Sequence, residues 1–113
     1  MDIKAFAARF WRDAAAQSRD ALRAYFLPDA AIRWHCTNEC FTVEEYLTAN
    51  CDYPGSWQGQ VERADVCGSG AVTVARVWSE GVCVYAVSFF TFENGKIKAL
   101  DEYWTDSGPA PEW

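Results

Sequence analysis

The chain has 113 residues, which is enough for one domain with one hydrophobic core. Its 16 acidic and 10 basic residues give a net charge of −6, which argues against nucleic acids and anionic membranes as partners. No basic-then-apolar leader opens the sequence and no apolar run is long enough to cross a bilayer, so we expect a cytoplasmic protein. Aromatic residues make up 16% of the chain, with six tryptophans, and this excess predicts a cavity wall or an oligomer interface in addition to a core.

The first part of the chain predicts two helices. Asp2 is placed to cap the first helix, and Ser18 is placed to cap a second, shorter one. Pro28 is expected to end the second helix, because proline and the residue before it both disfavour helical geometry. The apolar stripe of the first helix consists of Ile3, Phe6, Ala7, Phe10, Trp11 and Ala14.

A strand, a third helix and an aromatic turn follow. Residues 30–37 alternate in the manner of a strand, with Trp34 and His35 on opposite faces. Thr42 and Glu45 form a capping box, which predicts a helix that runs to about Asn50. The Pro-Gly pair at the centre of residues 53–57 is suited to a type II turn.

The remaining pattern is that of strands alone. Asn94-Gly95 predicts a hairpin of the primed type, and the other connections are equally short, so the strands form an antiparallel meander. Residues 107–113 are predicted to be an extended tail, which leaves residues 1–106 as a single domain. The four strands are predicted at residues 58–66, 71–78, 82–92 and 96–104.

The strand at 82–92 is apolar on both of its faces. Such a strand is expected to be central and covered on both sides, with helices as one cover. A second copy of the chain is the simplest second cover, and a sheet coiled tightly onto itself is the alternative.

The five cysteines lack the short paired spacings of a disulfide framework, which favours reduced thiols. His35, Cys36, Cys40 and Cys51 are the residues that a metal site would recruit. Because Cys36 and Cys40 do not have CxxC spacing and no second pair follows, small buried thiols are the favoured interpretation. The five cysteines of the chain are Cys36, Cys40, Cys51, Cys67 and Cys83.

The order of these elements and several short motifs resemble the nuclear-transport-factor-2-like superfamily, and its SnoaL-like branch in particular. The motifs are residues 26–30 before a strand, and Asn94-Gly95-Lys96-Ile97 leading to Glu102-Tyr103-Trp104. Residues 33–39 together with 53–57 are similar to small bacterial proteins of that branch. The resemblance implies an α+β cone (a cystatin-like roll), in which a curved antiparallel sheet wraps around the N-terminal helices and encloses a pocket. It also implies a homodimer formed through the outer sheet face.

His35 and Glu102 are the candidate catalytic residues. His35 is the single histidine, and a neutral imidazole can take up or relay a proton near neutral pH. Glu102 lies on the same strand face as Trp104, and the resemblance implies a pocket carboxylate on this last strand. Burial among aromatic rings would raise its pKa and make it a usable acid or base. The alternatives are a structural histidine, a surface carboxylate, and Asp101 rather than Glu102 as the inward acid.

The candidate ligand-binding residues are mostly aromatic. Tyr53 and Trp57 lie in a turn that can cover the mouth of the pocket. Asn38 and Glu39 either bind a polar group of the ligand or form a turn, and the turn is favoured because asparagine is a natural turn residue. The predicted ligand-binding set is Trp34, Asn38, Phe41, Tyr53, Trp57, Ser88, Phe90 and Trp104.

The sequence thus predicts a small-molecule pocket protein without a cofactor. One hypothesis is an acid–base enzyme, of the isomerase, dehydratase or cyclase type, that acts on a small apolar substrate with His35 as base and Glu102 as its partner. Neither the complete residue set of the isomerases nor that of the epoxide hydrolases can be placed in this chain. The alternative is therefore a non-catalytic module that binds a hydrophobic ligand or serves in dimerisation.

Overall fold

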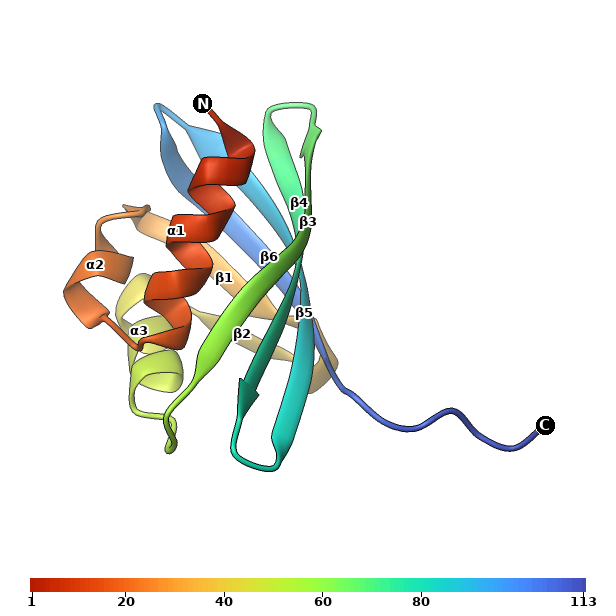
Figure 1. Cartoon of the computed structure of the whole chain (residues 1–113). Helices are drawn as coiled ribbons and strands as arrows, with labels where there is room; N and C mark the ends of the chain where they lie inside the picture. The colour runs from red at the N-terminus through yellow and green to blue at the C-terminus, as the bar shows by residue number, and fades with distance from the viewer.

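Three helices and a six-stranded sheet make up the fold, and the computed structural model describes all residues 1–113 (Figure 1). None of the helices is both long enough and apolar enough to span a membrane. In chain order the elements are α1 (Ile3–Ala15), α2 (Arg19–Arg23), β1 (Phe26–Trp34), the 3-10 turn η1 (His35–Thr37), β2 (Glu39–Phe41), α3 (Val43–Cys51), β3 (Gln58–Cys67), β4 (Gly70–Ser79), β5 (Val82–Glu93) and β6 (Lys96–Asp106).

The helices begin where local capping signals predict. The side chain of Asp2 accepts a hydrogen bond from the Ala5 amide at 3.1 Å and starts α1. Both halves of the Thr42–Glu45 capping box form and start α3. Ser18 occupies the cap position of α2 but makes no side-chain capping bond. Local hydrogen-bonding rules therefore account for the start of the two longer helices.

β1 differs from its prediction at both ends. It begins at Phe26, so Pro28 lies inside a strand and does not itself end α2, which stops at Arg23. The pairing of β1 with β6 shifts register between Phe26 and Ala31, and a proline, which has no N–H to donate, is accommodated where the regular pairing is interrupted. At the other end, His35–Thr37 forms a 3-10 turn that Asn38 closes with a φ of 58°. The prediction of a strand over residues 30–37 was therefore wrong for its last three residues.

The strand order is β2-β1-β6-β5-β4-β3. The β3–β6 meander is confirmed, and Asn94 and Gly95 have φ values of 52° and 75°, as the primed hairpin requires. β1 pairs with β6 in parallel, so the sheet is mixed and not purely antiparallel as predicted. The α+β class and the curved sheet that packs on the helices are confirmed (Figure 1).

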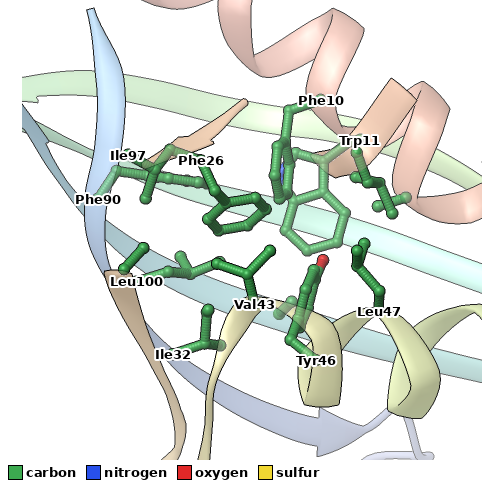
Figure 2. Packing of buried hydrophobic residues seen from close by; sticks show 14 of the residues in the cluster. Phe10, Trp11, Phe26, Ile32, Val43, Tyr46, Leu47, Phe90, Ile97 and Leu100 are labelled. Carbon is green, nitrogen blue, oxygen red and sulfur yellow. The ribbon is translucent and has the colours of Figure 1, made fainter. Parts of the chain in front are cut away.

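The core lies between α1, α3 and the concave face of the sheet, as Figure 2 shows with Phe10 of α1 and Tyr46 of α3 facing the strands. In the middle of β5, the side chains that point toward the helices (Ala86, Ser88 and Phe90) are buried, with Phe90 only 2% exposed. On the opposite face of the same sheet, Phe89 is 44% and Tyr103 43% exposed. The chain therefore covers only one side of the strand that was expected to be covered on both.

The tail and the cysteines lie outside this core. After β6 the chain leads away from the sheet (Figure 1), and Trp113 at its end is fully exposed. Cys36, Cys40 and Cys67 are exposed and the other two thiols are half-buried, so the prediction of buried thiols was wrong.

Candidate functional site

A cavity of about 460 Å³ opens where the C-terminal ends of α1 and α3 meet the sheet. Trp11 of α1, Trp34 of β1 and Trp104 of β6 form its aromatic wall, and Tyr53 and Trp57 lie in the loop before β3. The indoles of Trp34 and Trp104 are 6.1 Å apart, and those of Trp11 and Trp104 are 5.9 Å apart. The cavity therefore presents mainly aromatic rings and small aliphatic side chains to a ligand. Its other lining residues are Ala14, Ala15, Gln17, Cys36, Thr37, Glu39, Ala49, Asn50, Val77, Val82, Val84 and Asp106.

Hydrogen bonds within the protein fix the orientation of these indoles. Three of the four indole N–H groups donate to another group of the chain, and the fourth, on Trp104, is buried without a hydrogen-bond partner. A hydrogen bond from its N–H group fixes the orientation of an indole ring. The three bonds run from Trp11 to Thr73 Oγ1 at 3.2 Å, from Trp34 to Glu102 Oε1 at 3.1 Å and from Trp57 to the Pro54 carbonyl at 3.0 Å.

Glu102 is the most unusual ionisable group near the cavity. It is 1% exposed, and its second carboxyl oxygen accepts a hydrogen bond from Ser88 Oγ at 2.6 Å. Burial raises the pKa of Glu102 to about 7, even though the hydroxyl of Ser88 and the nearby indoles of Trp34 and Trp104 favour the charged form. The Trp104 N–H lies close enough to act on the carboxyl without forming a hydrogen bond of normal geometry. The carboxyl does not line the cavity but is joined to it by Trp34, which does.

Tyr46 adds a second buried ionisable group beside this carboxyl. Its side chain is 2% exposed, and Figure 2 shows its hydroxyl pointing from α3 toward Trp11. Burial first, and then the charge on Glu102, raise the pKa of Tyr46 well above its usual value, so the phenol stays protonated. In the sequence Tyr46 directly follows the Thr42–Glu45 capping box, and this local pattern does not reveal its proximity to Glu102.

His35 lies on the other face of the sheet. Its Nε2 is 2.7 Å from Asp101 Oδ1, its ring stacks on Tyr103 at 4.6 Å, and Arg33 approaches the same carboxylate at 3.6 Å. Trp34 and Glu102 are register partners in the parallel pairing of β1 with β6, and both point toward the helices. His35 follows Trp34 and therefore points to the outer face of the sheet, as Asp101 and Tyr103 do. The expected meeting of His35 and Glu102 in one cavity does not occur. The inward orientation of Glu102, rather than Asp101, is as predicted.

Four of the eight predicted ligand-binding residues line the cavity: Trp34, Tyr53, Trp57 and Trp104. The other four do not. Asn38 is exposed where it closes the 3-10 turn, which agrees with the favoured turn interpretation. Phe41 makes a T-shaped ring contact with Trp34, Ser88 donates a hydrogen bond to Glu102, and Phe90 belongs to the central core.

Several of the lining residues that sequence analysis missed come from the helices. The apolar stripe of α1 indicates that Trp11 is buried, but it does not distinguish a core contact from a cavity wall. Gln17 and Asn50 lie near the C-terminal ends of two neighbouring helices, and no local pattern in the sequence brings them together. The amide nitrogen of Gln17 bonds to the backbone carbonyl oxygens of Asn50 and Tyr53, at 3.0 and 2.6 Å.

Comparison with known proteins supports the fold. No family model matches the sequence, and no curated protein matches it. A solved protein of unknown function from Burkholderia xenovorans, described as nuclear-transport-factor-2-like, is 25% identical and superposes with a TM-score of 0.84 over 98% of this chain and 88% of its own. A protein from Kribbella flavida, provisionally named a ketosteroid isomerase, is 21% identical, with a TM-score of 0.83 over 98% of this chain and 83% of its own.

A third similar structure was solved with a small molecule. This protein from Catenulispora acidiphila, described as having a ketosteroid isomerase-like fold, is in complex with trimethylamine. It is 15% identical, with a TM-score of 0.70 over 85% of this chain and 82% of its own. The names of similar structures also include a SnoaL-like polyketide cyclase.

The protein is an α+β domain in which a curved sheet packs on helices and an aromatic cavity remains between them. The chain has the fold of the nuclear-transport-factor-2-like superfamily, and the resemblance predicted from its sequence is confirmed.

Proposed function

We propose that the protein binds a small molecule with an apolar body in the tryptophan-lined cavity. The observation that carries this proposal is the cavity itself, whose volume of about 460 Å³ lies within the range of ligand pockets in proteins. Twelve of its 17 lining residues are hydrophobic, so a ligand that enters would exchange water for apolar contacts. The trimethylamine held by the Catenulispora acidiphila protein supports a small ligand for this fold.

Filling the cavity should abolish ligand binding. Ala49 lines the cavity from α3, and Ala49→Phe would place a ring in the space that a ligand needs. We expect small aromatic and alicyclic compounds to change the tryptophan fluorescence and raise the melting temperature of the wild type, and to do neither in Ala49→Phe. Thr48→Phe, one residue earlier on the exposed side of α3, is the matched control and should bind as the wild type does. The proposal fails if a broad library gives no response, or if Ala49→Phe binds as well as Thr48→Phe.

Acid–base catalysis is the second candidate, and the buried Glu102 favours it. A carboxyl with a pKa of about 7 can both give and take a proton at neutral pH. The catalytic group is then Glu102 without His35, and a shift of Trp34, which now holds one of its oxygens, would bring the carboxyl to the cavity. In this account Glu102→Gln retains ligand binding and loses turnover. Full turnover in that variant would remove Glu102 from the mechanism.

The outer sheet face supports a further proposal, that two copies of the chain form a homodimer through it. Phe89 and Tyr103 lie side by side on this face with ring centroids 6.1 Å apart, and both are more than 40% exposed. Large rings left exposed together are typical of a protein interface.

A charge placed on this face should separate the dimer. We expect Phe89→Lys to weaken the dimer at least about tenfold in sedimentation equilibrium, because burying an unpaired ammonium group is costly. Val66→Lys is the control, since Val66 is 71% exposed on β3 and away from this face. A monomeric wild type would refute the proposal, and so would equal effects of the two substitutions.

A further inference from the structure

The hydrogen-bond donors and acceptors of the cavity wall differ in how far they are free to bind a ligand. Most hydrogen-bond donors are already used or hidden, since three indole N–H groups are bonded inside the protein and that of Trp104 is buried. The Gln17 amide nitrogen makes two bonds to backbone carbonyls, and the Asn50 amide nitrogen donates to the Ala14 carbonyl at 3.0 Å. The hydroxyl of Thr37 donates to Glu39 at 2.5 Å. The Asn50 amide nitrogen also donates to Cys51 Sγ at 3.9 Å, so the side-chain donors of the wall that a ligand acceptor would find free are the Tyr53 hydroxyl and the Cys36 thiol.

The amide acceptors, in contrast, remain free, and Glu39 keeps one carboxylate oxygen without a donor. Because backbone carbonyls fix the amide nitrogens of Gln17 and Asn50, the amide oxygens of both side chains are left without a donor. Glu39 and Asp106 are exposed at the rim, and neither forms an ion pair. No lysine, arginine or histidine is among the lining residues. The rim is thus negative in a chain whose net charge is already −6.

The aromatic wall, like the acceptors and the negative rim, favours a positively charged group. The face of an indole is the electron-rich part of the ring, and it attracts cations more strongly than the face of any other side chain. Four tryptophans and one tyrosine line this cavity, and the bonded N–H groups keep the positive edges of three indoles engaged with the protein. A neutral carbonyl compound would meet few donors here, and an anion would be repelled by the carboxylates of Glu39 and Asp106.

We propose that the ligand of this cavity is a small organic cation of the alkylammonium class, with its charged group among the tryptophan faces and near Glu39 and Asp106. The proposal rests on the proposed ligand-binding function and names the class of ligand. Methyl groups around a positive nitrogen supply the apolar body that the wall favours, and the positive charge matches the free acceptors and the rim.

A pair of probes that differ only in charge tests this directly. Choline and 3,3-dimethyl-1-butanol have nearly the same shape, with a quaternary nitrogen in one where the other has a carbon atom. We expect choline to bind at least about tenfold more tightly, in a titration followed by tryptophan fluorescence or calorimetry, because the ring faces and the carboxylates both act on the charge. Equal or weaker binding of choline would overturn the cation proposal and leave the proposed pocket function intact.

Charge-removing variants locate the effect. In Glu39→Gln with Asp106→Asn, the affinity for choline should fall about fivefold and that for the neutral alcohol should stay unchanged. Asp29→Asn with Glu62→Gln removes the same charge from exposed residues outside the cavity, and should leave both affinities within about twofold. Equal losses in the two double variants would overturn the placement of the cation at this rim.

Failure of the ligand class can be told apart from failure of the pocket. If neither choline nor its isostere binds, the cation proposal is refuted, and the compound library with Ala49→Phe and Thr48→Phe decides independently whether the cavity binds any ligand.

Discussion

Replacing Glu102 with glutamine is expected to remove most of a pH-dependent loss of stability that the wild-type protein shows between about pH 4.5 and pH 7. The ordinary pKa of this side chain is 4.5, and burial raises it to about 7 in the folded protein. Because the folded pKa is the higher one, the folded state holds the proton across this interval while the unfolded state releases it. The contribution of Glu102 to stability is therefore complete below about pH 4.5 and is lost as the pH rises through about 7.

The expected size of this loss is about 3 kcal/mol in the free energy of unfolding, from 1.36 kcal/mol for each pKa unit. It is measured by denaturant unfolding of the wild type and of Glu102→Gln at a series of pH values. Glutamine can still accept from Trp34 and donate to Ser88, so the variant should fold. Other carboxylates titrate in both proteins and cancel in the difference. Parallel pH profiles of the two proteins would show that Glu102 is not buried with a raised pKa.

Ser88→Ala provides a second variant for the same claim. Ser88 donates to Glu102 and thereby favours the charged carboxylate, so its loss should raise the pKa of Glu102 further and extend the interval of lost stability upward. An unchanged or lower pKa in this variant would contradict the role given to Ser88.

Gly70→Ala is expected to destabilise the fold more than most single substitutions, by more than about 4 kcal/mol. Gly70 begins β4 opposite Thr91, and a Cβ atom at this position would overlap the carbonyl oxygen of Phe90 and lie 3.0 Å from its carbonyl carbon. These are backbone atoms of the paired strand, so no side chain can move aside to relieve the clash. The two strands would have to separate at the point where they carry the core residue Phe90.

Gly68→Ala in the same turn is the matched control. Gly68 has a φ of 58° and open space around it, so alanine there should cost only about 1 kcal/mol, through backbone strain. Urea unfolding of the two variants compares the costs directly. A Gly70→Ala variant within about 1 kcal/mol of the wild type would show that β4 and β5 do not approach as closely as described.

The parts of the fold that were predictable from sequence depend on neighbours in the chain. The cap at Asp2, the Thr42–Glu45 box and the Asn94-Gly95 hairpin are local signals, and each forms as predicted. The parallel pairing of β1 with β6 joins residues about seventy positions apart, and no local pattern specifies it. The prediction that Pro28 ends a helix was wrong because its place in an irregular strand pairing depends on that distant partner.

The candidate site was predictable only in part, for a related reason. Alternation along β6 indicated that either Asp101 or Glu102 points inward, and Glu102 does. For His35, alternation gave the face opposite Trp34, and the imidazole does stack on Tyr103 of the outer face, so the expectation that it meets Glu102 in the cavity was wrong. Aromatic content indicated a cavity, but it does not reveal that Trp11 both packs in the core and lines the cavity, whereas Phe10 lies in the core alone.

The central claim is that small molecules enter the space between the helices and the concave face of the sheet, and the indole N–H signals of the six tryptophans test it most directly. In a nitrogen–proton NMR titration with choline, 3,3-dimethyl-1-butanol and the aromatic and alicyclic compounds of the library, the signals of the four tryptophans that line the cavity should shift with any compound that binds, and the two outside it should stay in place. Shifts confined to the two outside tryptophans, or no shift at saturating concentrations of any of these compounds, would contradict the account. The lining set is Trp11, Trp34, Trp57 and Trp104, and the two outside are Trp78 and Trp113.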